Sequence, residues 1–207
     1  MSHTLHRQGT KEALQHDFIV LSRATRGINY DGSKEKLRDF VKLAFKHNPV
    51  NLGSRKTGML LKTAEADMVE RTKDGTSSNA VFASMEDACG FIKDLQKDDF
   101  DLSVVCTGNE DAVRQICDEC GLKFHSANFS LGVYGRTDLL PRPEILEITT
   151  MCGHHLLSPY LVEDVAAKIK RGVLPLDKGA EMLVYPCVCA CVNLERVKEC
   201  LRKIIEE

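Results

Sequence analysis

The stretch AVFASMEDACGFIKDLQKDDFDLSVVC, residues 80–106, alternates between strand and helix patterns. The apolar run at 80–83 is typical of a short strand, and Ser84 with Asp87 has the spacing of a helix capping box. Residues 102–106 are again strand-like. A strand–helix–strand unit favours an α/β fold with a partly parallel sheet. Apolar residues at helical spacing lie between the two strands: Ala88, Phe91, Ile92 and Leu95.

The sequence on both sides extends this pattern. We predict an α/β fold in which a mixed, partly parallel sheet is flanked by helices and the C-terminal portion is mostly helical. An extended segment is expected at 124–134. Further strands are predicted at 17–22, 58–63 and 144–150, and further helices from Ser33, Asn109, Pro159, Leu176 and Asn193.

Length and composition indicate an ordinary globular chain. The 207 residues predict a single domain spanning 1–207, with a loose polar lead-in at 1–15 and a helical portion at 151–207 that carries the site described below. A formal net charge of −2 argues against a nucleic-acid-binding protein. No run approaches the roughly 20 apolar residues of a membrane span. The polar start, Met1 to Lys11, lacks a signal-peptide core, so we expect a cytoplasmic protein.

Nine cysteines are the most informative part of the composition. In a chain that is not exported, they should be reduced thiols or metal ligands. Five follow apolar faces and are predicted to be core residues: Cys89, Cys106, Cys117, Cys120 and Cys200.

The other four cysteines lie in two segments, TTMCGHHLLSP (149–159) and YPCVCACVN (185–193). Cys152 and His154 are two residues apart, and Gly153 allows the backbone to bend so that both face one point. Cys187 and Cys189 have the same spacing. Two such pairs provide four soft ligands for Zn(II) or an iron–sulfur cluster. We therefore predict Cys152, His154, Cys187 and Cys189 as metal ligands.

The same segments contain one surplus thiol and one surplus imidazole, Cys191 and His155. Surplus ligands suit a centre with an exchangeable position, so both are candidate catalytic residues. Cys191 also precedes a predicted helix start, where the partial positive charge favours a thiolate.

A basic loop bounded by glycines, Gly53-Ser54-Arg55-Lys56-Thr57-Gly58, is a candidate anion site. Its order differs from that of a P-loop, because Lys-Thr precedes the second glycine. Arg55 and Lys56 could still orient a small anionic molecule, and a solvated turn is the alternative interpretation.

Together these features predict a cytoplasmic metal-binding protein, most simply an enzyme that acts on a small anionic substrate through a Cys/His centre. Two alternatives remain open. One is a non-enzymatic binding or assembly protein in which the metal site is structural. The other is a metal-free thiol oxidoreductase, in which Cys152 would be the disulfide partner of the 187–191 thiols, since an i, i+2 bridge is strained.

Overall fold

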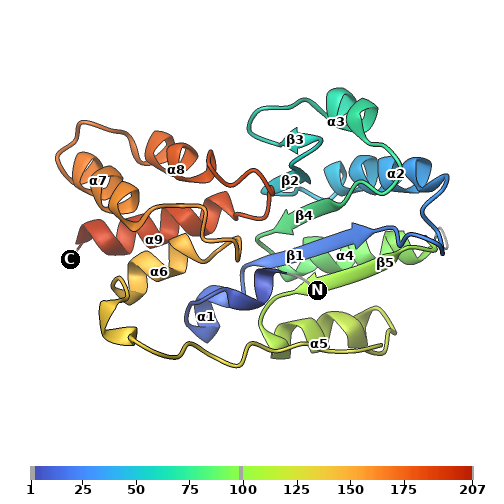
Figure 1. Ribbon diagram of the computed structural model, residues 1–207, viewed down its shortest axis with the longest axis horizontal. Helices are drawn as coiled ribbons and strands as arrows, with labels where there is room; N and C mark the ends of the chain where they lie inside the picture. Colours follow the sequence, from blue (N-terminus) through green and yellow to red (C-terminus); the bar gives the residue numbers. More distant parts are fainter. Residues whose placement is uncertain (1–2, 98–99, 207) are drawn as a thin grey trace.

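A five-stranded sheet forms the base of the computed structural model, which describes residues 3–97 and 100–206 (Figure 1). Within these ranges the strand order is β3-β2-β4-β1-β5, and each neighbouring pair is antiparallel. The strands are β1 (Phe18–Arg23), β2 (Asn51–Ser54), β3 (Gly58–Met59), β4 (Ser78–Phe82) and β5 (Ser103–Thr107).

The prediction of a partly parallel sheet was therefore wrong, and the reason is adjacency. Strands β4 and β5 do point the same way, as a strand–helix–strand unit requires, but β1 lies between them and is antiparallel to both. In the same way, β4 separates β1 from β2. Two β–α–β units thus interleave in a split β–α–β topology, so that no two parallel strands are neighbours.

Helices pack on one face of the sheet and against part of the other. The described helical elements are η1 (His3–His6), α1 (Lys11–Leu14), α2 (Ser33–Phe45), α3 (Glu65–Arg71), α4 (Met85–Lys97), α5 (Glu110–Glu119), η2 (Thr137–Leu139), α6 (Pro143–Thr149), α7 (Pro159–Lys170), α8 (Leu176–Val184) and α9 (Leu194–Glu206).

One face of the sheet packs on α2 and α4. Phe18 and Phe82 from the strands bury against Phe40 of α2 and Phe91 of α4, whose rings meet edge-on with centroids 5.0 Å apart. The predicted capping box at the start of α4 is confirmed, because the Asp87 backbone N–H donates to Ser84 Oγ at 3.0 Å.

The opposite face packs on the C-terminal helices α6 to α9, which lie together beside the strands (Figure 1). Ile19 of β1 and Val81 of β4 join their apolar core. The strand predicted at 144–150 is instead α6. Pro143 occupies its first turn, and the apolar positions bury at helical spacing although the segment is rich in β-branched residues.

The N-terminal lead-in is packed against the rest of the chain from residue 3 onward. Thr4 Oγ1 lies 2.9 Å from Thr107 Oγ1 on β5, and the Gln8 backbone N–H donates to Thr150 Oγ1 at 2.9 Å. Residues 1 and 2 of the predicted lead-in lie outside the described ranges. The assignment of the chain to one domain stays a prediction.

A buried ion pair joins α9 to the start of β1. Arg196, fully buried, donates through Nη1 to Asp17 Oδ2 at 2.9 Å and through Nη2 to the Gln8 carbonyl at 2.8 Å. Its Nη2 also lies 3.3 Å from Glu147 Oε2 on α6, and Arg7 pairs with the same Asp17. Burial lowers the pKa of Arg196, but the Asp17 carboxylate more than offsets this, so the net shift is upward. One guanidinium therefore ties α9, α6, β1 and the N-terminal segment together.

Replacing this guanidinium should destabilise the fold. Arg196→Met leaves the buried Asp17 with Arg7 as its remaining charged partner and removes the guanidinium from the half-buried Glu147, and we expect the free energy of unfolding to fall by about 3 kcal/mol. Urea denaturation measures it. Arg202→Met, at an exposed position of the same helix, is the matched control and should change stability by less than about 0.5 kcal/mol. Equal effects of the two substitutions would contradict the role given to Arg196.

Candidate metal centre

The segment between α6 and α7 turns Cys152 inward and leaves two imidazoles outside. Gly153 and His155 both have left-handed backbones, with φ of 76° and 53°. The Gly153 N–H closes a tight turn onto the Thr150 carbonyl at 2.7 Å. Cys152 is consequently buried, whereas His154 and His155 are exposed. The expected bend at Gly153 is confirmed.

The cysteine turn, residues 187–191, connects α8 to α9. The Ala190 N–H donates to the Cys187 carbonyl at 3.1 Å, so this segment is a turn and not a strand. Ala190 has a φ of 57°, a left-handed conformation that is strained for alanine and persists only when its surroundings enforce it. Cys187, Cys189 and Cys191 are all buried.

Two asparagines on the sheet hold this turn in place. Asn79 of β4 donates through Nδ2 to the Cys189 carbonyl at 2.9 Å, and Asn51 of β2 donates to the Val192 carbonyl at 2.9 Å. Both side chains are buried. Sequence reasoning did not single them out, although an asparagine inside the buried strand SNAVF was an available signal.

Three potential ligands converge where the two segments meet. Cys152 Sγ, one ring nitrogen of His154 and Cys189 Sγ all lie within 4.8 Å of one another and could hold a metal ion. This group contains three of the four predicted ligands. The fourth, Cys187, is not part of the group, but its thiol hydrogen-bonds to Cys152. Cys191 contacts Cys189 in the same way.

Hydrogen bonding favours the thiolate form at Cys152 over the other thiols of this cluster. The Cys187 and Cys189 thiols donate to its sulfur and lower the pKa of Cys152, with burial opposing. The backbone N–H groups of His154 and Leu156 lower it further. Those same hydrogen bonds, together with burial, raise the pKa of Cys187 and Cys189. Within the cluster, negative charge is therefore favoured on Cys152, to which Cys187 and Cys189 are hydrogen-bonded.

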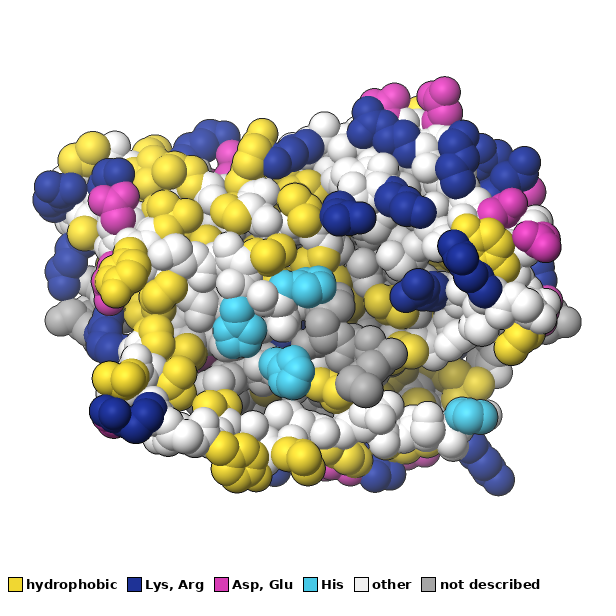
Figure 2. Space-filling model, viewed as in Figure 1, with side chains coloured by type: hydrophobic (Ala, Val, Ile, Leu, Met, Phe, Trp, Pro, Cys, Tyr) yellow, Lys and Arg dark blue, Asp and Glu magenta, His cyan; other side chains and the backbone are white. Residues whose placement is uncertain are grey.

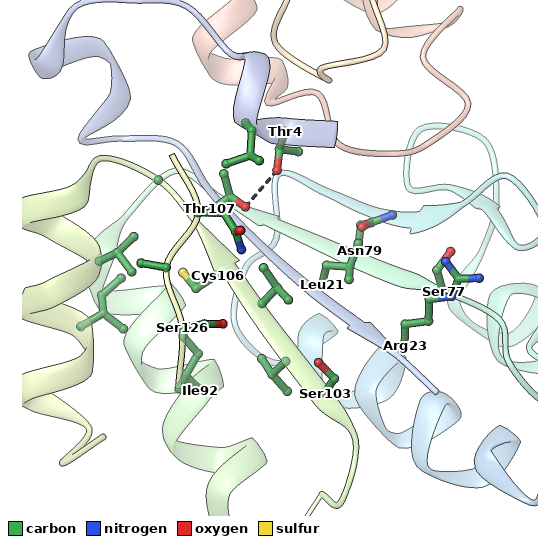
Figure 3. Close-up of a pocket in the computed structure, with 18 of the residues that line it drawn as sticks. Thr4, Leu21, Arg23, Ser77, Asn79, Ile92, Ser103, Cys106, Thr107 and Ser126 are labelled. Carbon is green, nitrogen blue, oxygen red and sulfur yellow. Dashed lines mark hydrogen bonds between the residues drawn. The ribbon is translucent and has the colours of Figure 1, made fainter. Parts of the chain in front are cut away.

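A cavity of about 1310 Å³ opens beside the cluster (Figure 3). His154 and Cys189 are among the residues that line it. Its floor is the sheet face that carries Leu21 and Asn79, and residues 122–130 run over it. On the outside, histidine side chains gather near the middle of the face shown in Figure 2, with Lys and Arg side chains to their right.

The remaining predicted site residues differ in their position relative to this cavity. Arg55, Lys56 and His155 are all exposed, and of these three only Arg55 lines the cavity. Cys191 is fully buried behind Cys189 and does not line it either. Arg23, which sequence reasoning missed, does line it. Arg23 directly follows the strand predicted at 17–22, and nothing in the sequence except its charge marked it as a site residue.

The other cysteines lie on the apolar elements predicted for them. Cys89, Cys120 and Cys200 are buried, and Cys106 and Cys117 are half-buried. Cys89 Sγ and Cys120 Sγ are 3.4 Å apart in the core beneath α4 and α5. These five residues are consistent with packing as the main role of cysteine outside the cluster.

Searches against protein-family models, curated proteins and solved structures returned no match for this chain. In addition, none of the helices in the described ranges combines the length and the hydropathy needed to cross a bilayer. The chemistry of the cluster therefore has to be argued from its own residues.

The reactivity of Cys200 tests the effect of burial on the pKa of a thiol. Burial raises the pKa of its thiol from about 9 to about 12. The protonated thiol therefore contributes stability below pH 9 that is lost as the pH rises towards 12. At pH 8 we expect iodoacetamide to alkylate Cys200 at least about a hundredfold more slowly in the folded protein than in urea, because only the thiolate reacts. Peptide mass spectrometry follows the modification. Equal rates in the two conditions would contradict the buried, protonated state.

Proposed function

We propose that the chain binds a single metal ion through Cys152, His154 and Cys189 and uses it as the reactive centre of an enzyme. One observation carries the proposal: three soft-ligand atoms from two separate loops lie within 4.8 Å of one another at the wall of a cavity. Neither loop has a structural need for two buried thiols beside an imidazole.

The compactness of the group favours one ion over an iron–sulfur cluster. Zinc lies about 2.3 Å from sulfur and about 2.0 Å from nitrogen, so its ligand atoms can be at most about 4.6 Å apart. The three atoms found here lie within 4.8 Å of one another, close to this limit. A cluster of several irons needs more widely spaced thiolates. Two cysteines and one histidine with a fourth position open is a ligand set of catalytic zinc.

Two observations bear on whether the fourth position is open. His154 is exposed and lines the cavity together with Cys189, which favours a position accessible to a small molecule. The Cys187 thiol, which is hydrogen-bonded to Cys152, is the group that could occupy the fourth coordination position and so close the site. A closed site would make the metal structural, in keeping with a binding or assembly protein.

In the open form, the ion would act as a Lewis acid or would activate a bound water. Arg55 would orient an anionic substrate from the cavity wall. His155, exposed beside His154, stays a candidate for proton transfer. Cys191, buried against Cys189, fits a role in supporting that ligand better than a role in catalysis. None of the nine cysteines in the described part of the chain forms a disulfide, which suits a reducing cytoplasm.

Metal analysis of purified variants tests the ligand set. We expect about one equivalent of metal in the wild-type protein and a loss of at least about tenfold in affinity in Cys152→Ser, Cys189→Ser and His154→Ala. Cys117→Ser, a half-buried thiol on α5, is the control and should keep its metal. A folded wild-type protein without metal, after expression with zinc and iron supplied, would contradict the proposal.

The Cys187→Ser variant then distinguishes a centre with an open fourth position from a centre closed by Cys187. Retention of metal supports three protein ligands and an exchangeable fourth, whereas loss supports a closed structural site. A brown protein with visible absorption would identify an iron–sulfur cluster instead. A metal-free protein that forms a reversible Cys152 disulfide after mild oxidation would support the thiol oxidoreductase.

A further inference from the structure

The cavity beside the metal centre carries an excess of positive charge. The carboxylates that line it already have partners: Asp101 pairs with Lys36 at 2.9 Å, and Glu110 pairs with Arg114 at 2.7 Å. Arg23 and Arg55 also line it, and in the described part of the chain neither forms an ion pair. Since the negative groups are neutralised and these cations are not, the cavity favours an anion.

Sheet register places Arg23 next to Ser77. The β1–β4 pairing ends at Ser22 and Ser78, so Arg23 and Ser77 are the next residues of their two chains, whereas Arg55 lies in the turn that follows β2. Figure 3 shows Arg23 and Ser77 side by side at one end of the cavity. A guanidinium beside a hydroxyl, with Arg55 as a second guanidinium lining the same cavity, suits the oxygen atoms of a carboxylate or phosphate, which arginine can bind with paired hydrogen bonds.

The next residue along β4 on the same face, Asn79, offers an unused acceptor. Its Nδ2 donates to the Cys189 carbonyl at 2.9 Å and to the Gly53 carbonyl at 3.4 Å, so both neighbours of the nitrogen are acceptors and the amide orientation is fixed. Its Oδ1 is buried and has no hydrogen-bond partner among the described residues. The side chain lines the cavity and is only 3% exposed. A buried acceptor without a donor is costly, and a ligand O–H or N–H would remove that cost.

Spacing along the strand sets the size of the ligand. Ser77 and Asn79 are two residues apart, so the anion-binding pair Arg23 and Ser77 is separated from the free acceptor by about 6.6 Å. Beyond them, Leu21 and Val105 provide an apolar surface towards β5. Because Asn79 contacts the carbonyl of Cys189, the donor end of such a ligand would lie next to the metal centre.

The geometry points to a small organic anion as the ligand of this cavity. Its carboxylate or phosphate binds Arg23 and Ser77, with Arg55 as the second cation of the cavity, a hydroxyl or amino group about 7 Å away donates to Asn79 Oδ1, and an apolar body rests on Leu21 and Val105. That this ligand is the substrate rests on the proposed function. Its binding does not require the metal.

Binding can be measured with anilinonaphthalene sulfonate, a fluorescent probe that combines an anionic group, an N–H donor and apolar rings. We expect saturable binding of an equimolar amount to the wild-type protein and about tenfold weaker binding to the Arg23→Ala, Arg55→Ala double variant. Arg202→Ala, which removes an exposed charge on α9, should bind like the wild type. Circular dichroism and sedimentation verify that each protein is folded. Absence of binding to the wild type, or equal binding to the double variant, would overturn the proposal.

A pair of competitors tests the Asn79 acceptor. 4-Hydroxyphenylacetate and phenylacetate differ only in a hydroxyl group, and we expect the hydroxylated acid to displace the probe at about tenfold lower concentration. Equal potency would overturn the assignment of Asn79. Inorganic phosphate should displace the probe poorly, and displacement as effective as that by the organic acid would overturn the organic part of the ligand.

The two proposals can fail separately. Arginine-dependent probe binding by a protein that holds no metal supports the anion site and contradicts the metal enzyme. A protein that holds metal but binds no probe supports the metal centre and contradicts the anion site. Measuring metal content on the same samples gives both answers.

Discussion

The candidate site depends on two buried hydrogen bonds from the sheet to the cysteine turn. Asn79 and Asn51 donate to the carbonyls of Cys189 and Val192, and both amides project from strands that have neighbours on each side. A rigid sheet thereby sets the position of a loop that would otherwise be held only by the ends of α8 and α9. The Arg196–Asp17 pair fixes α9 to β1 a few residues further on. Because the cysteine turn is held in this way, the separation between Cys189 and Cys152 on the other loop is set by the packing of the fold.

Several features of the site oppose stability, and they are concentrated where the two loops meet. Ala190 is left-handed, four thiols share one buried cluster, and Asn79 Oδ1 lacks a donor. A chain selected for stability alone would fill this space with apolar side chains. Strain and incomplete hydrogen bonding of this kind accumulate at functional sites, where a ligand supplies what the protein leaves out. A bound metal would replace the thiol protons, and an O–H or N–H group of an organic ligand would donate a hydrogen bond to Asn79 Oδ1.

Local sequence patterns predicted most elements but not how they are arranged. The helix periodicity after Ser84 and the strand at 17–22 are both present, since each depends on residues close in sequence. The alternation at 80–106 determines that β4 and β5 point the same way, yet no local signal shows that β1 inserts between them. EILEITT resembles a strand by composition, and only its packing against α9 and the sheet makes it a helix. For the site, ligand chemistry and spacing indicated the two loops, whereas Asn79 and Arg23 matter only because the register brings them to the cavity.

The central claim is that two sulfurs and one imidazole nitrogen hold a single ion. X-ray absorption spectroscopy of the purified, metal-loaded protein tests this most directly, because it reports the type and distance of the atoms around the metal. The account predicts two sulfurs at about 2.3 Å, a nitrogen at about 2.0 Å and one further light atom or sulfur, with no second metal nearby. A metal–metal scattering shell, or a coordination sphere without sulfur, would contradict it.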